Sequence, residues 1–155
     1  CCRNCRWSLQ LRRKASSKSV WRAALASADA FDAWLDAYAR AHDGGDVALL
    51  KSLFGETAEF FETPFNAPAK GAEVISTYFA DIWARTADSV FEIEKIAEGW
   101  AHWTMGGTIV ALDEPYRANG ILKVELDADG RCHSLTLWTE RLSVRESDML
   151  SQRDA

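Results

Sequence analysis

The chain has 155 residues, of which 48% are hydrophobic, and it carries 23 acidic against 18 basic residues. This length suits one domain with a substantial core. The negative charge argues against a nucleic-acid partner, because phosphate backbones repel it. The longest uncharged run, residues 100–112, is too short to span a bilayer. The sequence therefore predicts one domain with no nucleic-acid or membrane partner.

The beginning of the chain differs in composition from the rest. No Asp or Glu precedes Asp29, whereas seven of the 18 basic residues do. A basic, Ser-rich, acid-free segment has features of an organellar transit segment, and the missing initiator methionine fits upstream sequence or an artificial extension equally well. We expect residues 1–25 to be a disordered or non-native extension, residues 26–145 to form the domain, and residues 146–155 to be a tail.

The cysteines argue against a metal site. Cys2 and Cys5 have a Cys-x-x-Cys spacing, but no second Cys or His pair follows at a zinc-ligand distance. Cys132 is the one cysteine of the predicted domain, residues 26–145. A single cysteine fits a reducing compartment, so we expect the protein to be in the cytoplasm. The body has no Gly-rich phosphate loop and no His/Cys cluster, so we expect neither a metal nor a cofactor.

Helical periodicity covers much of the first half of the domain. Ser27 predicts the N-cap of a first helix, which ends at the Asp-Gly-Gly of residues 43–45. Asp46 predicts the cap of a second helix that stops at Gly55, and a third helix opens at Gly71. The apolar face of the first helix consists of Phe31, Trp34, Leu35 and Tyr38. The predicted buried face of the third consists of Val74, Ile75, Tyr78, Phe79, Ile82 and Trp83.

A period of two residues indicates strands. An early strand, residues 58–65, lies between the second and third helices, and four more follow the third helix. These four span residues 89–97, 100–110, 116–126 and 131–142. In the strand at residues 116–126, Leu122 and Val124 alternate with Lys123 and Glu125, so we expect one face to be buried and the other exposed to solvent. The order of elements predicts an α+β fold with helices on one concave face of a strongly curved sheet.

Four stretches of the chain carry a family resemblance. They are residues 31–60 (FDAWLDAYAR…), residues 62–83 (ETPFNAPAKG…), residues 99–104 (GWAHWT) and residues 127–142 (DADGRCHSLTLWTERL). In this order they resemble the nuclear transport factor 2-like superfamily in its bacterial SnoaL-like branch. The resemblance implies a cone, in which a curved antiparallel or mixed sheet wraps around three N-terminal helices. It also implies an apolar cavity for a small hydrophobic molecule.

The resemblance and the strand alternation together define a predicted ligand pocket. Its residues are Trp34, Tyr38, Phe60, Phe65, Tyr78, Trp103, Met105, Leu122, Val124, Leu135 and Leu137. The alternation alone points Leu122, Val124, Leu135 and Leu137 inward. Large aromatic residues at helix and strand spacings are as compatible with a plain core as with a ligand site.

Glu62 is the candidate catalytic residue. If Phe60 faces inward, so does Glu62, and a carboxylate desolvated beside Phe60, Phe65 and Trp103 would suit a general base or acid. In the opposite register Phe61 is buried and Glu62 is solvated. The superfamily includes isomerases, cyclases, epoxide hydrolases and non-catalytic modules. The open alternatives are a cofactor-independent isomerase, cyclase or hydrolase, and a non-catalytic binding module.

Four residues on the opposite sheet face predict a homodimer. Trp100, His102, Trp138 and Glu140 alternate with inward positions, and outward tryptophans need covering. A slip of one residue would instead bring His102 inside. The remaining histidines, His42 and His133, lie near a helix end and a turn, where exposure or capping explains them.

Overall fold

The computed structural model describes residues 17–142, with side chains from Asp29 onward. The helices are α1 (Ser17–Gly44), α2 (Val47–Ser52) and α3 (Ala72–Ala84). The strands are β1 (Phe54–Phe61), β2 (Ala69–Lys70), β3 (Thr86–Ala97), β4 (Trp100–Ile109), β5 (Glu114–Leu126) and β6 (Cys132–Leu142). None of the helices in this part of the chain has the length and hydropathy needed to cross a bilayer.

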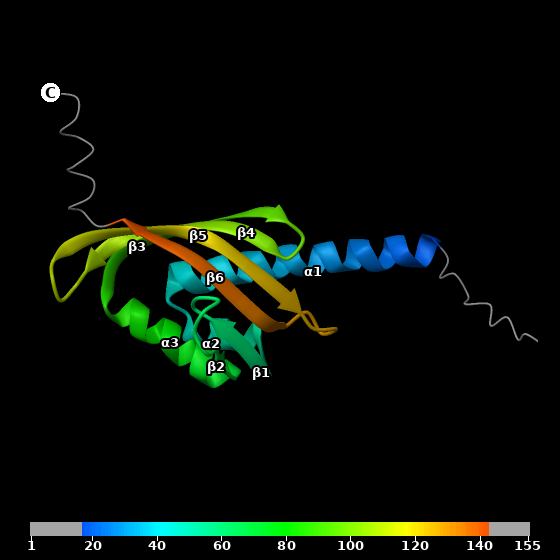
Figure 1. Ribbon diagram of the computed structural model, residues 1–155, viewed down its shortest axis with the longest axis horizontal. Coiled ribbons are helices and arrows are strands. Elements are labelled where there is room, and N and C mark those ends of the chain that lie inside the picture. The colour runs from blue at the N-terminus through cyan, green and yellow to red at the C-terminus, as the bar shows by residue number, and fades with distance from the viewer. Residues whose placement is uncertain (1–16, 143–155) are drawn as a thin grey trace, which may run out of the picture.

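All six strands form one curved sheet in the order β2-β1-β6-β5-β4-β3. Strands β3 to β6 make an antiparallel meander, whereas β1 pairs with β6 in parallel. Figure 1 shows α1 running beneath the sheet, with α2 and α3 on the same side. The fold is therefore α+β with a mixed sheet, as the sequence predicted, and the helices cover one face of it.

The core lies between α1 and the concave face of the sheet. The helix contributes Phe31, Trp34 and Tyr38, each at most 2% exposed, and the sheet contributes Leu122 and Leu135, both fully buried. Burying a side chain of this size contributes about 1.5–3 kcal/mol. The predicted amphipathic faces of α1, β5 and β6 are thus confirmed.

Local signals set the ends of several elements. The Asp46 carboxylate accepts a hydrogen bond from the backbone N–H of Leu49 and caps α2, as predicted. Gly99 turns the β3–β4 hairpin with a φ of +74°, and a Cβ at this position would lie 2.9 Å from the Val124 carbonyl oxygen. A non-glycine residue would be strained there, so this glycine fixes the register of the hairpin.

Three predictions about the helices are wrong. The first helix begins at Ser17 instead of Ser27, because the helix-forming residues before Ser27 continue the helix backwards. The second helix ends at Ser52, and Gly55 belongs to β1. Val74 is 53% exposed, since α3 buries a narrower face than its apolar content suggested. Of the predicted extension, residues 17–25 are helical, whereas residues 1–16 and the predicted tail lie outside the described residues.

Candidate active site

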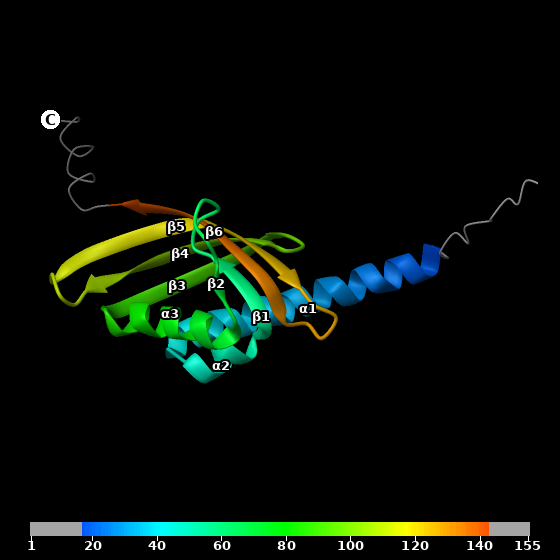
Figure 2. The same cartoon turned by 60° about the horizontal axis from the view of Figure 1, so that its bottom comes forward.

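Glu62 follows β1 directly and lies at the rim of the concave face. Ala58 and Phe60 of the same strand are buried, so the alternation points Glu62 to the side of the helices, as the first of the two registers predicted. Its side chain is nevertheless 42% exposed. The expected desolvation beside Phe65 is wrong, because Phe65 is 95% exposed on the connection to β2. Figure 2 shows this connection projecting past β6, away from the helices.

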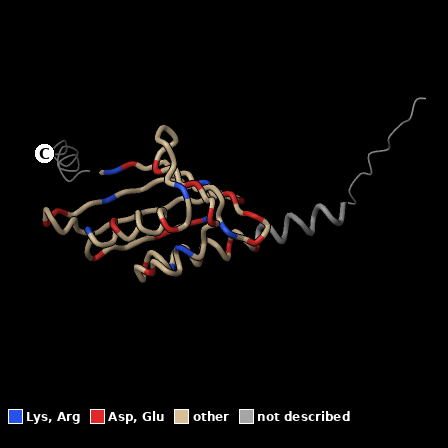
Figure 3. Tube along the Cα trace, turned by 90° about the horizontal axis from the view of Figure 1, so that it is seen from below, with Lys and Arg blue, Asp and Glu red and all other residues tan. Residues whose placement is uncertain are grey.

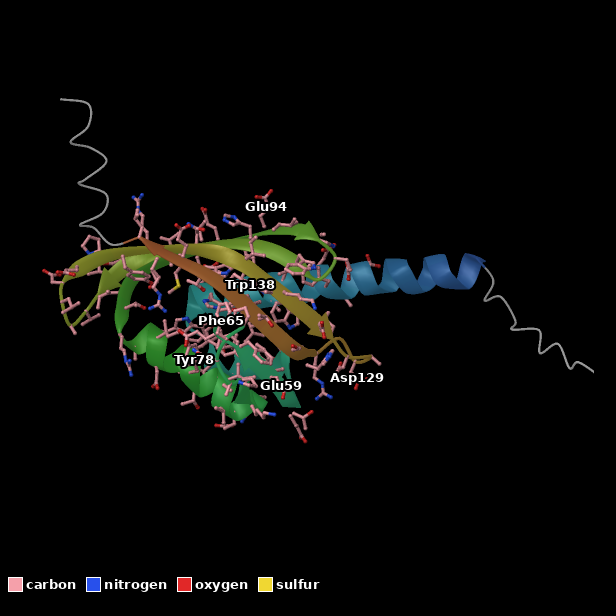
Figure 4. The ribbon with its side chains drawn as sticks, viewed as in Figure 1. Glu59, Phe65, Tyr78, Glu94, Asp129 and Trp138 are labelled. Carbon is pink, nitrogen blue, oxygen red and sulfur yellow. The ribbon has the colours of Figure 1, made fainter. Side chains whose placement is uncertain are left out.

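Two side chains from distant elements meet the Glu62 carboxylate. Arg141 Nη2 of β6 lies 3.5 Å from Glu62 Oε1, and the Tyr78 hydroxyl of α3 donates a hydrogen bond to the carboxylate. Burial, this hydrogen bond and the nearby Glu62 charge raise the pKa of Tyr78, against a smaller opposing effect of Arg141. Figure 4 shows Tyr78 beside α3, below the sheet. We call Glu62, Tyr78 and Arg141 the rim cluster.

The rim cluster borders an apolar wall. The Phe60 ring lies 5.1 Å from the ring of Tyr78 and 5.3 Å from that of Phe79, and Phe60 is only 2% exposed. On the sheet, Met105 and Leu137 are half-buried and pack against the core. The β4–β5–β6 register pairs Met105 with Ala118, and Ala118 with Arg141, so Met105 and Arg141 lie in one row. Charged and apolar groups therefore meet at this end of the concave face.

The structure divides the predicted pocket residues into two groups. Tyr78 belongs to the rim cluster, and Met105 and Leu137 are half-buried near it. The buried members of the predicted pocket all belong to one core cluster, and they are Trp34, Tyr38, Phe60, Trp103, Leu122, Val124 and Leu135. Most predicted pocket residues thus fill the core, and Phe65 belongs to neither group.

The prediction that His42 is exposed or a cap is wrong. Its imidazole lies inside a cluster of rings, stacked on Phe91 at a centroid distance of 4.1 Å and edge-on to Phe79 and Trp83, both at 5.3 Å. Burial lowers the pKa of His42 to about 3, so that the ring is neutral near pH 7. Its spacing of four residues from Tyr38 puts it on the buried face of α1, and this signal could have revealed it.

Other candidate groups are inert or open to solvent. The buried Cys132 has a pKa raised by desolvation to about 12, so the thiol stays protonated and is a poor nucleophile. His133 is exposed and lies 3.4 Å from Glu125. Within the described residues, no three His, Cys, Asp or Glu side chains gather as metal ligands would.

An open cleft of about 320 Å³ lies at the other end of the domain. Its walls come from α1, the β3–β4 turn and the end of β5, and it is lined by Ala30, Phe31, Glu98, Gly99, Val124, Leu126 and Asp127. Val124 is the only one of the predicted pocket residues that lines this cleft. The Asp127 carboxylate already accepts hydrogen bonds from the backbone N–H groups of Asp129 and Arg131 in the β5–β6 turn. This cleft is therefore separate from the rim cluster.

The outer face of the sheet carries the residues predicted to point outward. Trp100 and Trp138 stack with their ring centroids 5.6 Å apart and are 37% and 40% exposed. Between them on β5, Ile121 is 41% exposed, and it pairs with both His102 and Trp138. This stacked pair, together with Ile121, forms what we call the outer apolar patch.

The family model for the SnoaL-like domain matches residues 31–134, more than half of the chain. The chain belongs to the SnoaL-like domain family. This family lies in the nuclear transport factor 2-like superfamily, as the sequence resemblance indicated. None of the curated protein sequences matches the chain.

Solved structures share the fold of this SnoaL-like domain. A steroid delta-isomerase from Pseudomonas aeruginosa aligns with a TM-score of 0.58 at 14% identity, over 81% of this chain and 96% of its own. An LEH-like epoxide hydrolase from M. tuberculosis aligns with a TM-score of 0.53 at 15% identity, over 73% of this chain and 84% of its own. A proposed polyketide cyclase from Xanthomonas campestris aligns with a TM-score of 0.58 at 13% identity, over 77% and 95%. At these identities the likeness concerns the fold alone.

Proposed function

We propose that this SnoaL-like domain binds a small, largely apolar molecule on the concave side of its sheet, with Glu62 as the proton acceptor for that molecule. The observation that carries the proposal is the rim cluster, in which a carboxylate, a phenol and a guanidinium meet beside the half-buried apolar residues Met105 and Leu137. A ligand with one polar end would lay its apolar part along the wall and direct its polar end to the rim.

The rim cluster has the groups that proton transfer needs without a cofactor. Glu62 can take a proton from a carbon or a water and return it in a later step. The Tyr78 hydroxyl and the Arg141 guanidinium can stabilise negative charge that develops on a ligand oxygen. This chemistry is shared by isomerases, cyclases and hydrolases, the three reaction types that the relatives' names suggest.

One hydrolase arrangement fits poorly. Members that resemble limonene epoxide hydrolase carry an Asp-Arg-Asp set, and the positions that match it in this chain are Gly99, Ala101 and Leu137. None of these three residues has an ionisable side chain, and Ala101 is fully buried. We therefore place the proposed chemistry at Glu62 instead of at these strand positions.

Replacing Glu62 by glutamine tests the proposal. We expect the Glu62→Gln protein to keep its affinity for small apolar ketones, enols or epoxides, measured by tryptophan fluorescence, but to lose about 100-fold or more of any turnover. Glu59→Gln is the matched control, since Glu59 lies on the other strand face and pairs with Lys70 at 2.7 Å. Equal turnover in the wild type and in the two variants would rule out Glu62 as the base. If the wild type bound the ligand without turnover, the protein would instead be a non-catalytic binding module.

A second proposal concerns the outer apolar patch, which we infer to be covered by a second copy of the chain. Trp100, Ile121 and Trp138 expose apolar surface on one side of the sheet, and the connection from β1 to β2 projects past β6, away from the helices. Figure 3 colours the tip of the projecting connection tan, because residues 63–69 include no Lys, Arg, Asp or Glu. The same sheet face presents acidic residues on β3, among them Glu94 (Figure 4), and a lysine on β5, Lys123. A two-fold related copy could bury the patch and pair these opposite charges.

Sedimentation equilibrium at micromolar concentration tests this second proposal. We expect the wild type to be a dimer and the Trp138→Lys protein to be a monomer, because a lysine would leave a charge in the buried patch. Leu112→Lys is the matched control, since Leu112 is 61% exposed at the β4–β5 turn, outside the patch. A monomeric wild type, or a dimeric Trp138→Lys protein, would contradict the proposal.

A further inference from the structure

Strand β3 lies at the end of the sheet, so only one of its two edges is paired. It pairs with β4, and within residues 17–142 no other strand lies beside it. In this part of the chain, no backbone–backbone hydrogen bond outside the β3–β4 ladder involves a residue of β3. Every second residue of an edge strand directs its backbone N–H and C=O groups away from the sheet. These groups are available to a strand from outside the domain.

The regular part of β3 is the run from Val90 to Glu94, which we call the β3 edge. Each residue of this run pairs with one residue of β4 without a shift of register. A bulge between Ala87 and Val90 bounds it at one end. At the other end Lys95 turns inward and pairs with Asp32 of α1. Bulges and inward-pointing charges interrupt strand pairing, so the run between them is the part of β3 that can take a further strand.

The two faces of the β3 edge differ in charge. Glu92 and Glu94 are exposed on the outer face, and Figure 4 shows Glu94 directed away from the helices. Val90, on the same face, is 62% exposed. Phe91 and Ile93 point to the concave side, where they are half-buried and pack against the core. A strand added beside this run would therefore meet two carboxylates on one face and apolar surface on the other.

The two glutamates decide which strand fits the β3 edge. If two copies of the chain paired their β3 edges antiparallel around Ile93, Glu92 of each copy would lie opposite Glu94 of the other. Like charges directly opposite each other on a sheet face are destabilising. An acidic strand of any other protein is disfavoured for the same reason. Basic residues at alternate positions would instead form cross-strand ion pairs with the two carboxylates.

We propose that the β3 edge is a docking site for an extended, basic peptide segment of a partner protein, which adds a seventh strand to the six-stranded sheet. The backbone of the segment hydrogen-bonds to β3, and its Lys or Arg residues face Glu92 and Glu94. The apolar residues between them continue the surface of Phe91 and Ile93. Neither the rim cluster nor the outer apolar patch includes a residue of β3, so this site is separate from both.

Three matched peptides test the proposal. The first is acetyl-Thr-Val-Lys-Val-Lys-Val-Thr-amide, the second has Glu in place of Lys, and the third is the lysine peptide with its central backbone nitrogens methylated. The measurement is the backbone ¹H–¹⁵N NMR spectrum of the full chain during titration at low ionic strength, followed by amide hydrogen exchange. We expect the lysine peptide to bind about ten-fold more tightly than the glutamate peptide. We also expect it to slow the exchange of β3 amide protons, and its methylated form to bind about ten-fold more weakly, because it lacks the donor groups.

Reversing the charge of the β3 edge gives a second test. The double variant Glu92→Lys, Glu94→Lys should prefer the glutamate peptide over the lysine peptide, a reversal that a loss of folding cannot produce. Asp129→Lys is the matched control, since the Asp129 side chain is 79% exposed in the β5–β6 turn, far from β3 in the sheet order. Trp138→Lys, in the outer apolar patch, should also keep the wild-type preference.

The outcomes separate this inference from the proposed function. Equal binding of the lysine peptide and its methylated form would indicate association by charge alone and would overturn the added strand. A lysine peptide that does not bind, or a double variant that keeps the wild-type preference, would overturn the proposal as well. None of these results bears on turnover at Glu62, so the two proposals can fail independently.

Discussion

The wild type is expected to lose stability steeply as the pH falls from 6.5 to about 5, and replacing His42 by phenylalanine is expected to remove this loss. The folded protein holds His42 neutral among the rings of Tyr38, Phe79, Trp83 and Phe91, and burial lowers its pKa from 6.5 to about 3. The unfolded chain binds a proton near pH 6.5, but the folded chain does not. The free energy of unfolding therefore falls as the pH falls through this interval, by about 1.4 kcal/mol per pH unit from this residue.

The measurement is urea unfolding, followed by tryptophan fluorescence, at a series of pH values. The wild type should lose about 2 kcal/mol more than the His42→Phe protein between pH 6.5 and 5. The carboxyl pKa values of Glu125 and Asp127 are lowered, chiefly by Lys123 and by the backbone N–H of Arg131, so their contributions are lost at lower pH. His133→Gln, at an exposed site, should keep the wild-type slope. Parallel pH profiles for wild type and His42→Phe would show that His42 does not occupy a desolvated site.

Replacing Gly120 by alanine should destabilise the protein by about 3 kcal/mol, because the added methyl group has no room. Gly120 lies in the middle of β5, paired with Trp103 on β4 and Thr139 on β6. A Cβ there would overlap the backbone carbonyl oxygen of Trp138 and lie 3.0 Å from the Trp103 ring. Backbone cannot move aside as a flexible side chain can. The change would therefore disturb the packing of Trp103 and the outer apolar patch together.

Gly106→Ala is the matched control for this prediction. Gly106 lies on the adjacent strand β4, and a Cβ there would meet the Tyr116 carbonyl oxygen at 3.6 Å and Arg117 Cγ at 4.0 Å, which is ordinary contact. The free energy of unfolding of the Gly106→Ala protein should differ from that of the wild type by less than about 1 kcal/mol. Alanine also lowers the conformational entropy of the unfolded chain, which favours the folded state. Urea unfolding of both proteins at neutral pH measures the difference. Similar losses for the two substitutions would refute the steric argument at Gly120.

The second half of the fold could be predicted from the sequence because its signals are local. The alternation of Leu122 and Val124 with Lys123 and Glu125 defines the buried face of β5, and Gly99 marks the hairpin that starts β4. Such period-two patterns need only neighbouring residues. The start of α1 was harder to predict, because the basic, acid-free composition before Ser27 is typical of an extension although its residues favour a helix.

The candidate site was less predictable because distant elements build it. Glu62 could be singled out from its strand, but Arg141 lies 79 residues away, and its contact depends on the parallel pairing of β1 with β6. No local pattern carries that information. The helical spacing of His42 from Tyr38 does indicate the buried face of α1, but the Asp-Gly-Gly that follows indicates a helix end, where side chains are usually exposed.

The parallel pairing of β1 with β6 also bears on how the chain is made. β1 is complete at Phe61, but its partner begins only at Cys132, after every other strand of the sheet has been synthesised. On the ribosome the first strand must therefore wait, with the edge that pairs with β6 still open, until the last strand emerges. Contacts so distant along the chain slow folding. A chain that stops before β6 would keep α1 and the β3–β5 meander but leave an open edge, and it would be prone to aggregate.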